Sequence, residues 1–385
     1  MIKCASVYTF EVDIPEIALS EIKEQLDKKI TLLEHTVGII MCHPEFIVTG
    51  ILKHICLNLP FDLAVITTAS QAVNDAAGEL ILTVFVMTSD DVRFETGVTE
   101  SVCEDVDGPV GVAYEKIAAR IPEIPKLAVV FPPFGLHAGD AYVSAWEKVI
   151  SDTPLFGTCA IDDTASFAEC ETIHNGMSYK DAMSFLLCYG NITPRFLVAT
   201  LSENNAMTSK AEVTKAAGNH VYEINHMNAY QYFKALEFTE SVTYTPFKID
   251  FLKREDYDGV SVIRGHASFT EEGAAVFYGD VDEGSTFTML ICDPDDILST
   301  TQQKLELINQ LPDVNGTLLF PCVVRRAALL GANKPLSELE NARETINPKI
   351  PFMMGYAGGE ICPTSVKSGV PANRFHNYSL VVLVI

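Results

Sequence analysis

The chain has 385 residues, 48% of them hydrophobic, and its 27 Lys and Arg face 51 Asp and Glu for a formal net charge of -24. This composition excludes a disordered or fibrous protein, and the length predicts two domains. The charge repels phosphate backbones and anionic lipids, so we expect neither nucleic acid nor a membrane surface as a partner.

The N-terminal half is predicted to alternate helices with buried strands. Ile22, Leu26 and Ile30 recur every four residues, which indicates a helix that follows Asp13. Uninterrupted short apolar runs are typical of strands buried on both faces. Such strands are predicted at 37–42, 61–67, 79–87 and 126–131, helices at 109–121 and 138–151, and successive strands separated by turns over 167–200.

A polar segment rich in small residues, 201–219, predicts a domain boundary that divides the chain into 1–205 and 206–385. Many adjacent strands favour an α+β fold, in which two lobes of mixed or antiparallel sheets are covered by helices as in an αββα-like sandwich. In the second half, helices are predicted at 228–236, 298–311 and 337–346, and strands at 259–263, 274–279, 285–292, 316–322 and 379–385. Ser337 and Glu340 predict a capping box at the start of the last helix.

The ten cysteines are scattered and include no Cys-x-x-Cys, which is typical of reduced thiols in a cytoplasmic protein. The N-terminus shows no signal-peptide pattern. Cys42, His43, His54 and Cys56 at first resemble zinc ligands. On a helix, however, positions 54 and 56 point about 200° apart and cannot share a metal. We therefore predict no metal site.

The most informative polar residues lie in the second half. Arg325 follows an apolar strand, where its guanidinium either pairs with a carboxylate or faces a cavity and binds a ligand carboxylate or phosphate. Glycines before Glu360 permit unusual backbone torsions and close approach of a ligand. His376 and Asn377 precede the terminal strand. The alternative is an internal Arg325–Glu360 ion pair with a structural histidine.

Short motifs follow one another along the chain at 66–69, 154–163 and 174–176 in the first half, and at 213–224, 322–325, 355–361 and 375–377 in the second. This ordered set resembles the FIST family, sensory domains found in bacterial signal transduction proteins and in some eukaryotic F-box proteins. The resemblance spans about residues 30–385. One departure is Asn225-His226, where the family usually has an acidic residue and a glycine; both residues tolerate positive φ, so the turn can be retained.

The resemblance implies a cytoplasmic sensory protein that binds a small ligand, such as an amino acid or a similar metabolite, in or between the lobes. It supplies no established catalytic residue, and although some relatives bind haem and respond to nitric oxide, we predict no cofactor for this chain. Because the chain contains no kinase or cyclase module, a stand-alone sensor would signal through a separate protein of such a kind. The predicted ligand-binding residues are Arg325 for a carboxylate, Glu360 or Asp163 for an ammonium group, His376 and Asn377 beside them, and Thr68 from the first lobe.

Three alternatives are weighed against this hypothesis. A haem-binding nitric oxide sensor would use one of the nine histidines as its axial ligand. A cysteine-dependent enzyme would pair Cys322 with His376, although burial on an apolar strand raises a thiol pKa and restricts access. A purely structural or interaction protein would need no pocket.

Overall fold

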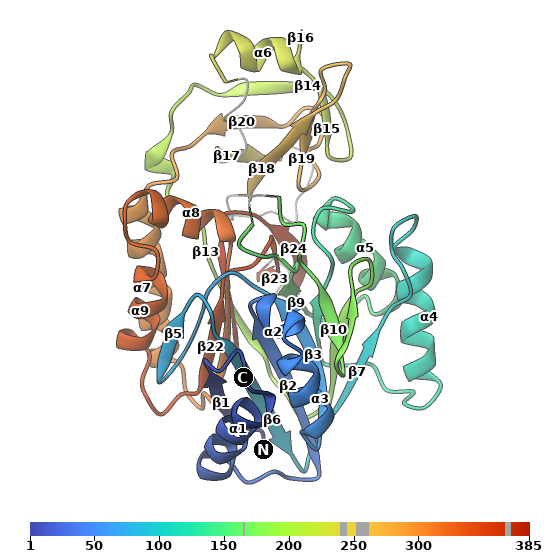
Figure 1. The fold of residues 1–385 in the computed structure, drawn as a ribbon. Coiled ribbons are helices and arrows are strands. Elements are labelled where there is room, and N and C mark those ends of the chain that lie inside the picture. Colours follow the sequence, from blue (N-terminus) through green and yellow to red (C-terminus); the bar gives the residue numbers. More distant parts are fainter. Residues whose placement is uncertain (165, 239–244, 252–261, 366–370) are drawn as a thin grey trace.

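The computed structural model describes residues 1–385 except 165, 239–244, 252–261 and 366–370 (Figure 1). It confirms an α+β fold of mixed and antiparallel sheets covered by helices. The described strands form three six-stranded sheets, named sheets I, II and III here, and a small seven-stranded barrel that lies at the top of the molecule in Figure 1.

Sheet I contains most of the N-terminal strands, and apolar faces of α1 and α3 pack on it. Its only parallel pair among the described strands is β2–β3. The strands predicted at 37–42 and 61–67 are confirmed as β2 and β3. In sheet order the strands are β1 (Lys3–Thr9), β6 (Leu82–Ser89), β2 (His35–Cys42), β3 (Asp62–Thr67), β10 (Thr172–His174) and β11 (Met177–Tyr179), and the helices are α1 (Pro15–Lys29), α2 (Glu45–Val48) and α3 (Ile51–Asn58).

Sheet II combines strands that are distant in the sequence. The hairpin β23–β24, from the C-terminal end of the chain, pairs with β9. Helices α4 and α5 pack on its outer face. The strands are β24 (Pro371–His376), β23 (Glu360–Ser365), β9 (Leu155–Thr158), β8 (Leu127–Phe131), β12 (Ser184–Gly190) and β7 (Val92–Val98), and the helices are α4 (Asp107–Ala118) and α5 (Gly139–Val149).

Sheet III in turn takes β4 and β5 from the N-terminal half, paired with β22. Sheets II and III therefore both contain strands from each side of residue 205. The helices packed against sheet III include α7 and α9. The strands are β13 (Arg195–Ala199), β25 (Leu380–Val384), β21 (Thr317–Pro321), β22 (Phe352–Gly355), β4 (Gln71–Val73) and β5 (Ala76–Gly78), and the helices are α7 (Pro294–Gln310), α8 (Val323–Gly331) and α9 (Ser337–Thr345).

The barrel is closed by the pairing of β14 with β15, and phenylalanine rings fill its interior. The predicted turn is confirmed, because Asn225 and His226 both have positive φ, at 49° and 62°. Part of the strand predicted at 259–263 falls outside the described residues. The strands are β14 (Ala211–Ala217), β20 (Thr286–Met289), β17 (Pro246–Asp250), β18 (Val262–Phe269), β19 (Ala275–Phe277), β15 (His220–Ile224) and β16 (Met227–Asn228), with η1 (Glu203–Asn205) before them and α6 (Ala229–Ala235) beside them.

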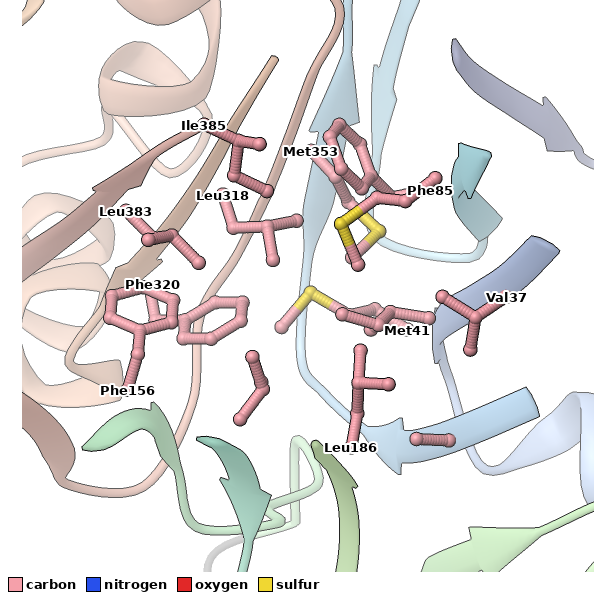
Figure 2. Close-up of a cluster of buried hydrophobic side chains, with 14 of the residues drawn as sticks. Val37, Met41, Phe85, Phe156, Leu186, Leu318, Phe320, Met353, Leu383 and Ile385 are labelled. Carbon is pink, nitrogen blue, oxygen red and sulfur yellow. The ribbon is translucent and has the colours of Figure 1, made fainter. Parts of the chain in front are cut away.

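One hydrophobic core joins sheets I, II and III (Figure 2). Met41 of β2, Phe156 of β9 and Phe320 of β21 meet in it, and the Phe156 and Phe320 rings stack with centroids 4.9 Å apart. Strand β25 is buried along its whole length, as its apolar sequence predicts. None of the described helices is long and apolar enough to cross a bilayer.

Two local predictions need correction. Residues 323–331 form the helix α8, which was not predicted. Arg325 therefore lies in the first turn of a helix and not at the end of a strand. Helix α9 begins at the predicted Ser337, but its N-cap is Leu336 and no side chain caps it. Short apolar runs suit a strand and a buried helix equally well, which explains why α8 was missed.

Candidate functional site

Arg325 lies in a buried hydrogen-bond network. Its Nη2 donates to Glu338 Oε1 at 2.6 Å and to Thr301 Oγ1 at 2.7 Å. Tyr356 Oη donates to the other oxygen of Glu338, at 2.9 Å. Arg325 and Glu338 are both fully buried. Its guanidinium thus pairs with Glu338 and not with Glu360, and Arg325 is not part of the pocket lining described below.

Glu360, the first residue of β23, is buried beside the N-terminus of α8. Its Oε2 accepts hydrogen bonds from Ser379 Oγ at 2.7 Å and from Ser379 N at 3.3 Å. Its Oε1 has no hydrogen-bond partner among the described residues. Burial raises the pKa of Glu360 to about 8, against smaller lowering effects of Ser379 and the Cys322 thiol. This carboxyl group is therefore largely protonated at neutral pH.

Cys322 is the N-cap residue of α8 and is only 4% exposed. Burial raises the pKa of its thiol well above the ordinary value, and the nearby Glu360 charge raises it further, although the amides of Val324 and Tyr378 lower it. The groups next to the thiol are thus a carboxyl and backbone amides. His376, the base that a cysteine enzyme would need, instead bonds to the carbonyl of Cys362, with 3.0 Å between Nε2 and the oxygen.

The Cys322 thiol is expected to resist alkylation in the folded protein. The exposed Cys103 provides the internal comparison. Because the thiolate is the reactive species, iodoacetamide at neutral pH should modify Cys103 much faster than Cys322. Peptide mass spectrometry over a time course measures both rates. Modification of Cys322 as fast as Cys103 would contradict the expectation.

A pocket with a volume of about 280 Å³ opens in front of Cys322. Three parts of the molecule line it: two separate loops with Phe134 and Phe167, the barrel strand β18 with Tyr278 just after β19, and the C-terminal segments around α8, β23 and β25. The Phe134 ring lies 5.2 Å from Phe167 and 5.2 Å from Tyr278, centroid to centroid. The other residues of the lining are Ser166, Gly265, Ala267, Cys322, Val323, Val324, Gly358, Gly359, Asn377 and Tyr378.

The Gly358–Gly359 turn forms the inner wall of the pocket. Gly358 N donates to the Cys159 carbonyl at 2.9 Å, and Cys159 N donates to the Gly359 carbonyl at 3.1 Å. Gly359 has φ +87°, and a Cβ on Gly358 would lie 2.2 Å from Ile161 Cγ2. Both positions therefore require glycine, one for its torsion and the other for space. The unusual backbone expected before Glu360 is present at Gly359.

Asn377 lines the pocket and connects it to the barrel. Its Oδ1 accepts a hydrogen bond from Gly265 N of β18, at 3.2 Å. Next to it, Tyr378 adopts a positive φ of 58°, uncommon for a residue other than glycine. This segment therefore links β24, β25 and the barrel at the pocket.

The remaining predicted residues are not part of the described lining. His376 is buried, and burial lowers its pKa to about 4. Thr68 is buried, and its backbone N donates to the Cys42 carbonyl. Asp163 Oδ1 lies 3.1 Å from His43 Nε2. Of the six predicted residues, Asn377 alone is part of the described lining, and Glu360 adjoins it.

Sequence reasoning missed the aromatic side of the pocket. Phe134, Phe167 and Tyr278 come from three separate connections, and aromatic residues in loops carry no signal of where they will meet. Glu338 was missed because it lies in a polar helix whose other acidic residue in the first turn, Glu340, is exposed. The motifs contain the other side of the pocket: Cys322 and the two residues after it, Gly358 and Gly359, Asn377, and the adjoining Glu360.

Comparison with protein-family models finds two consecutive matches. The FIST N domain matches residues 36–227, and the FIST C domain matches residues 229–363. The junction between them lies after the predicted boundary between residues 205 and 206, and the hairpin β14–β15 separates the two positions. A search of curated proteins found no similar sequence. FIST domains are recognised as small-ligand sensory domains of signal transduction proteins, and the two matches cover nearly the whole chain. The chain belongs to the FIST family.

Proposed function

We propose that this protein is a cytoplasmic sensor that binds a small metabolite in the pocket before Cys322 and signals through a separate protein, such as a kinase or a cyclase. The family assignment supports a sensory role. All ten cysteines carry free thiols, which suits a reducing compartment.

The observation that carries this proposal is the composition of the pocket wall. Phe134, Ala267 and Cys322 belong to the FIST N part, the barrel and the segment before α8, and all three line one pocket. A ligand bound there contacts the barrel and the body of the protein at once. Its binding free energy therefore depends on their relative position, which is the requirement for converting binding into a conformational signal.

The pocket volume suits a ligand about the size of an amino acid. An amino acid carries a carboxylate, however, and Arg325, the guanidinium predicted to hold it, pairs with Glu338. A haem group is less well supported, because no histidine is part of the described lining. An absorption spectrum of freshly purified protein distinguishes a haem sensor from a sensor of a colourless metabolite, since bound haem gives a Soret band.

Filling the pocket is expected to abolish ligand binding without unfolding the protein. Ala267 of β18 is half-buried in the lining, whereas the adjacent Ser268 is exposed and outside it. Ala267→Trp should lose any small molecule that native mass spectrometry finds retained by the wild type, with affinity at least about tenfold weaker. The matched control Ser268→Trp should retain it. Equal retention in both variants would place the ligand elsewhere.

A further inference from the structure

Aromatic rings form much of the pocket. Phe134, Phe167, Tyr278 and Tyr378 all line it, and Phe134 is within 5.2 Å of two other rings, centroid to centroid. The faces of aromatic rings carry partial negative charge and attract cations within about 6 Å. Such a wall favours ammonium groups and apolar bodies over anions.

An incompletely bonded carboxyl group lies behind the inner wall. Cys322 and Gly359 line the pocket, and Glu360 follows the glycine and interacts with the thiol. Ser379 donates both its hydrogen bonds to Oε2, and the nearby Cys322 thiol, a weak donor, also stabilises the carboxylate, but Oε1 has no partner within hydrogen-bond distance among the described residues. A buried polar atom without a partner is costly, and a nearby cation would offset that cost.

A ligand carboxylate, by contrast, meets no positive charge in the described lining. Two buried guanidinium groups of the described residues are engaged elsewhere: Arg325 pairs with Glu338, and Arg264 pairs with Asp140 at 3.2 Å. Burying a carboxylate there would cost desolvation that no cation of the described lining offsets. The net charge of -24 also attracts cations toward the protein and repels anions.

From these contacts we infer that the pocket selects an organic cation, namely an amine or a quaternary ammonium compound, over a carboxylic acid. The ammonium end lies toward the wall of Cys322 and Gly359, and the apolar body contacts the aromatic rings. This inference rests on the proposed function and specifies the ligand class for the same pocket.

Cation binding should also displace a proton. The titratable groups that face Glu360 are Cys322 and Cys159, whose thiols stay protonated, and Arg325, which stays charged. Glu360 itself is largely protonated at neutral pH before binding, because burial raises its pKa to about 8. A bound ammonium group favours the ionised carboxylate, so Glu360 releases its proton to the buffer.

Isothermal titration of the full chain with three matched probes tests the ligand class. Benzylammonium, benzyl alcohol and benzoate share one ring and differ in charge. Benzylammonium should bind roughly tenfold more tightly than benzyl alcohol, with benzoate weaker than both, and its heat should vary with the ionisation enthalpy of the buffer. Equal binding of benzylammonium and benzyl alcohol would overturn the inference and leave the pocket as a binding site. Binding of none of the three would count against the pocket itself.

The variant Glu360→Gln isolates the contribution of the carboxyl group. It should bind benzyl alcohol as the wild type does, but lose most of the preference for benzylammonium and the proton release. The control Glu79→Gln removes a surface carboxylate that pairs with Arg326, and it should keep both properties. A preference that persists unchanged in Glu360→Gln would overturn the assignment of the cation to this wall.

Discussion

Replacing Arg325 with Met is expected to destabilise the protein by about 3–5 kcal/mol, the range measured when one partner of a buried ion pair is removed. The Met side chain fills similar space but leaves the carboxylate of Glu338 buried with only the hydroxyls of Thr301 and Tyr356 as donors. Urea unfolding followed by circular dichroism measures the loss.

Two further variants test whether the ion pair is the cause. The neighbouring Arg326 pairs with the half-exposed Glu79 and donates to Ser70 Oγ, so Arg326→Met should cost clearly less, about 1–2 kcal/mol. The double variant Arg325→Met with Glu338→Gln removes both charges and should recover part of the stability. If the free energy of unfolding of Arg325→Met lies within about 1 kcal/mol of the wild-type value, the network does not stabilise the fold as argued.

The second prediction concerns the pH dependence of stability. Because of Glu360, the free energy of unfolding is expected to fall as the pH rises. Burial raises its pKa from 4.5 to about 8, so the folded protein holds this proton more tightly than the unfolded chain. The resulting stabilisation is fully present below pH 4.5 and is lost as the pH rises through 8. The slope approaches about 1.4 kcal/mol per pH unit at most.

Two histidines act in the opposite direction at lower pH. Burial lowers the pKa values of His266 and His376 from 6.5 to about 4, so both destabilise the fold as pH falls below 6.5. Between pH 6.5 and 8 the effect of Glu360 should therefore dominate among these three groups. Unfolding free energies measured across this window should fall for the wild type and for Glu79→Gln, but stay nearly constant for Glu360→Gln. Parallel slopes for all three proteins would contradict the assignment.

Local patterns in the sequence determined much of the secondary structure. The apolar runs of β2, β8 and β25 predicted buried strands because a strand covered on both faces needs no polar residues. Helical periodicity predicted α5 and α7. The ordered motifs also identified the family, and several of the residues they contain, among them Cys322, Gly359 and Asn377, line the pocket.

The tertiary structure alone decided which buried groups meet. The sequence showed that Arg325 needs a partner, but periodicity does not distinguish Glu360 from Glu338, which reaches the guanidinium only because α9 packs beside α7 and α8. The same limit applies to β23 and β24, which complete a sheet of N-terminal strands. Burial patterns report how much of a segment is covered, whereas strand pairing and ion pairing depend on long-range packing that no local pattern encodes.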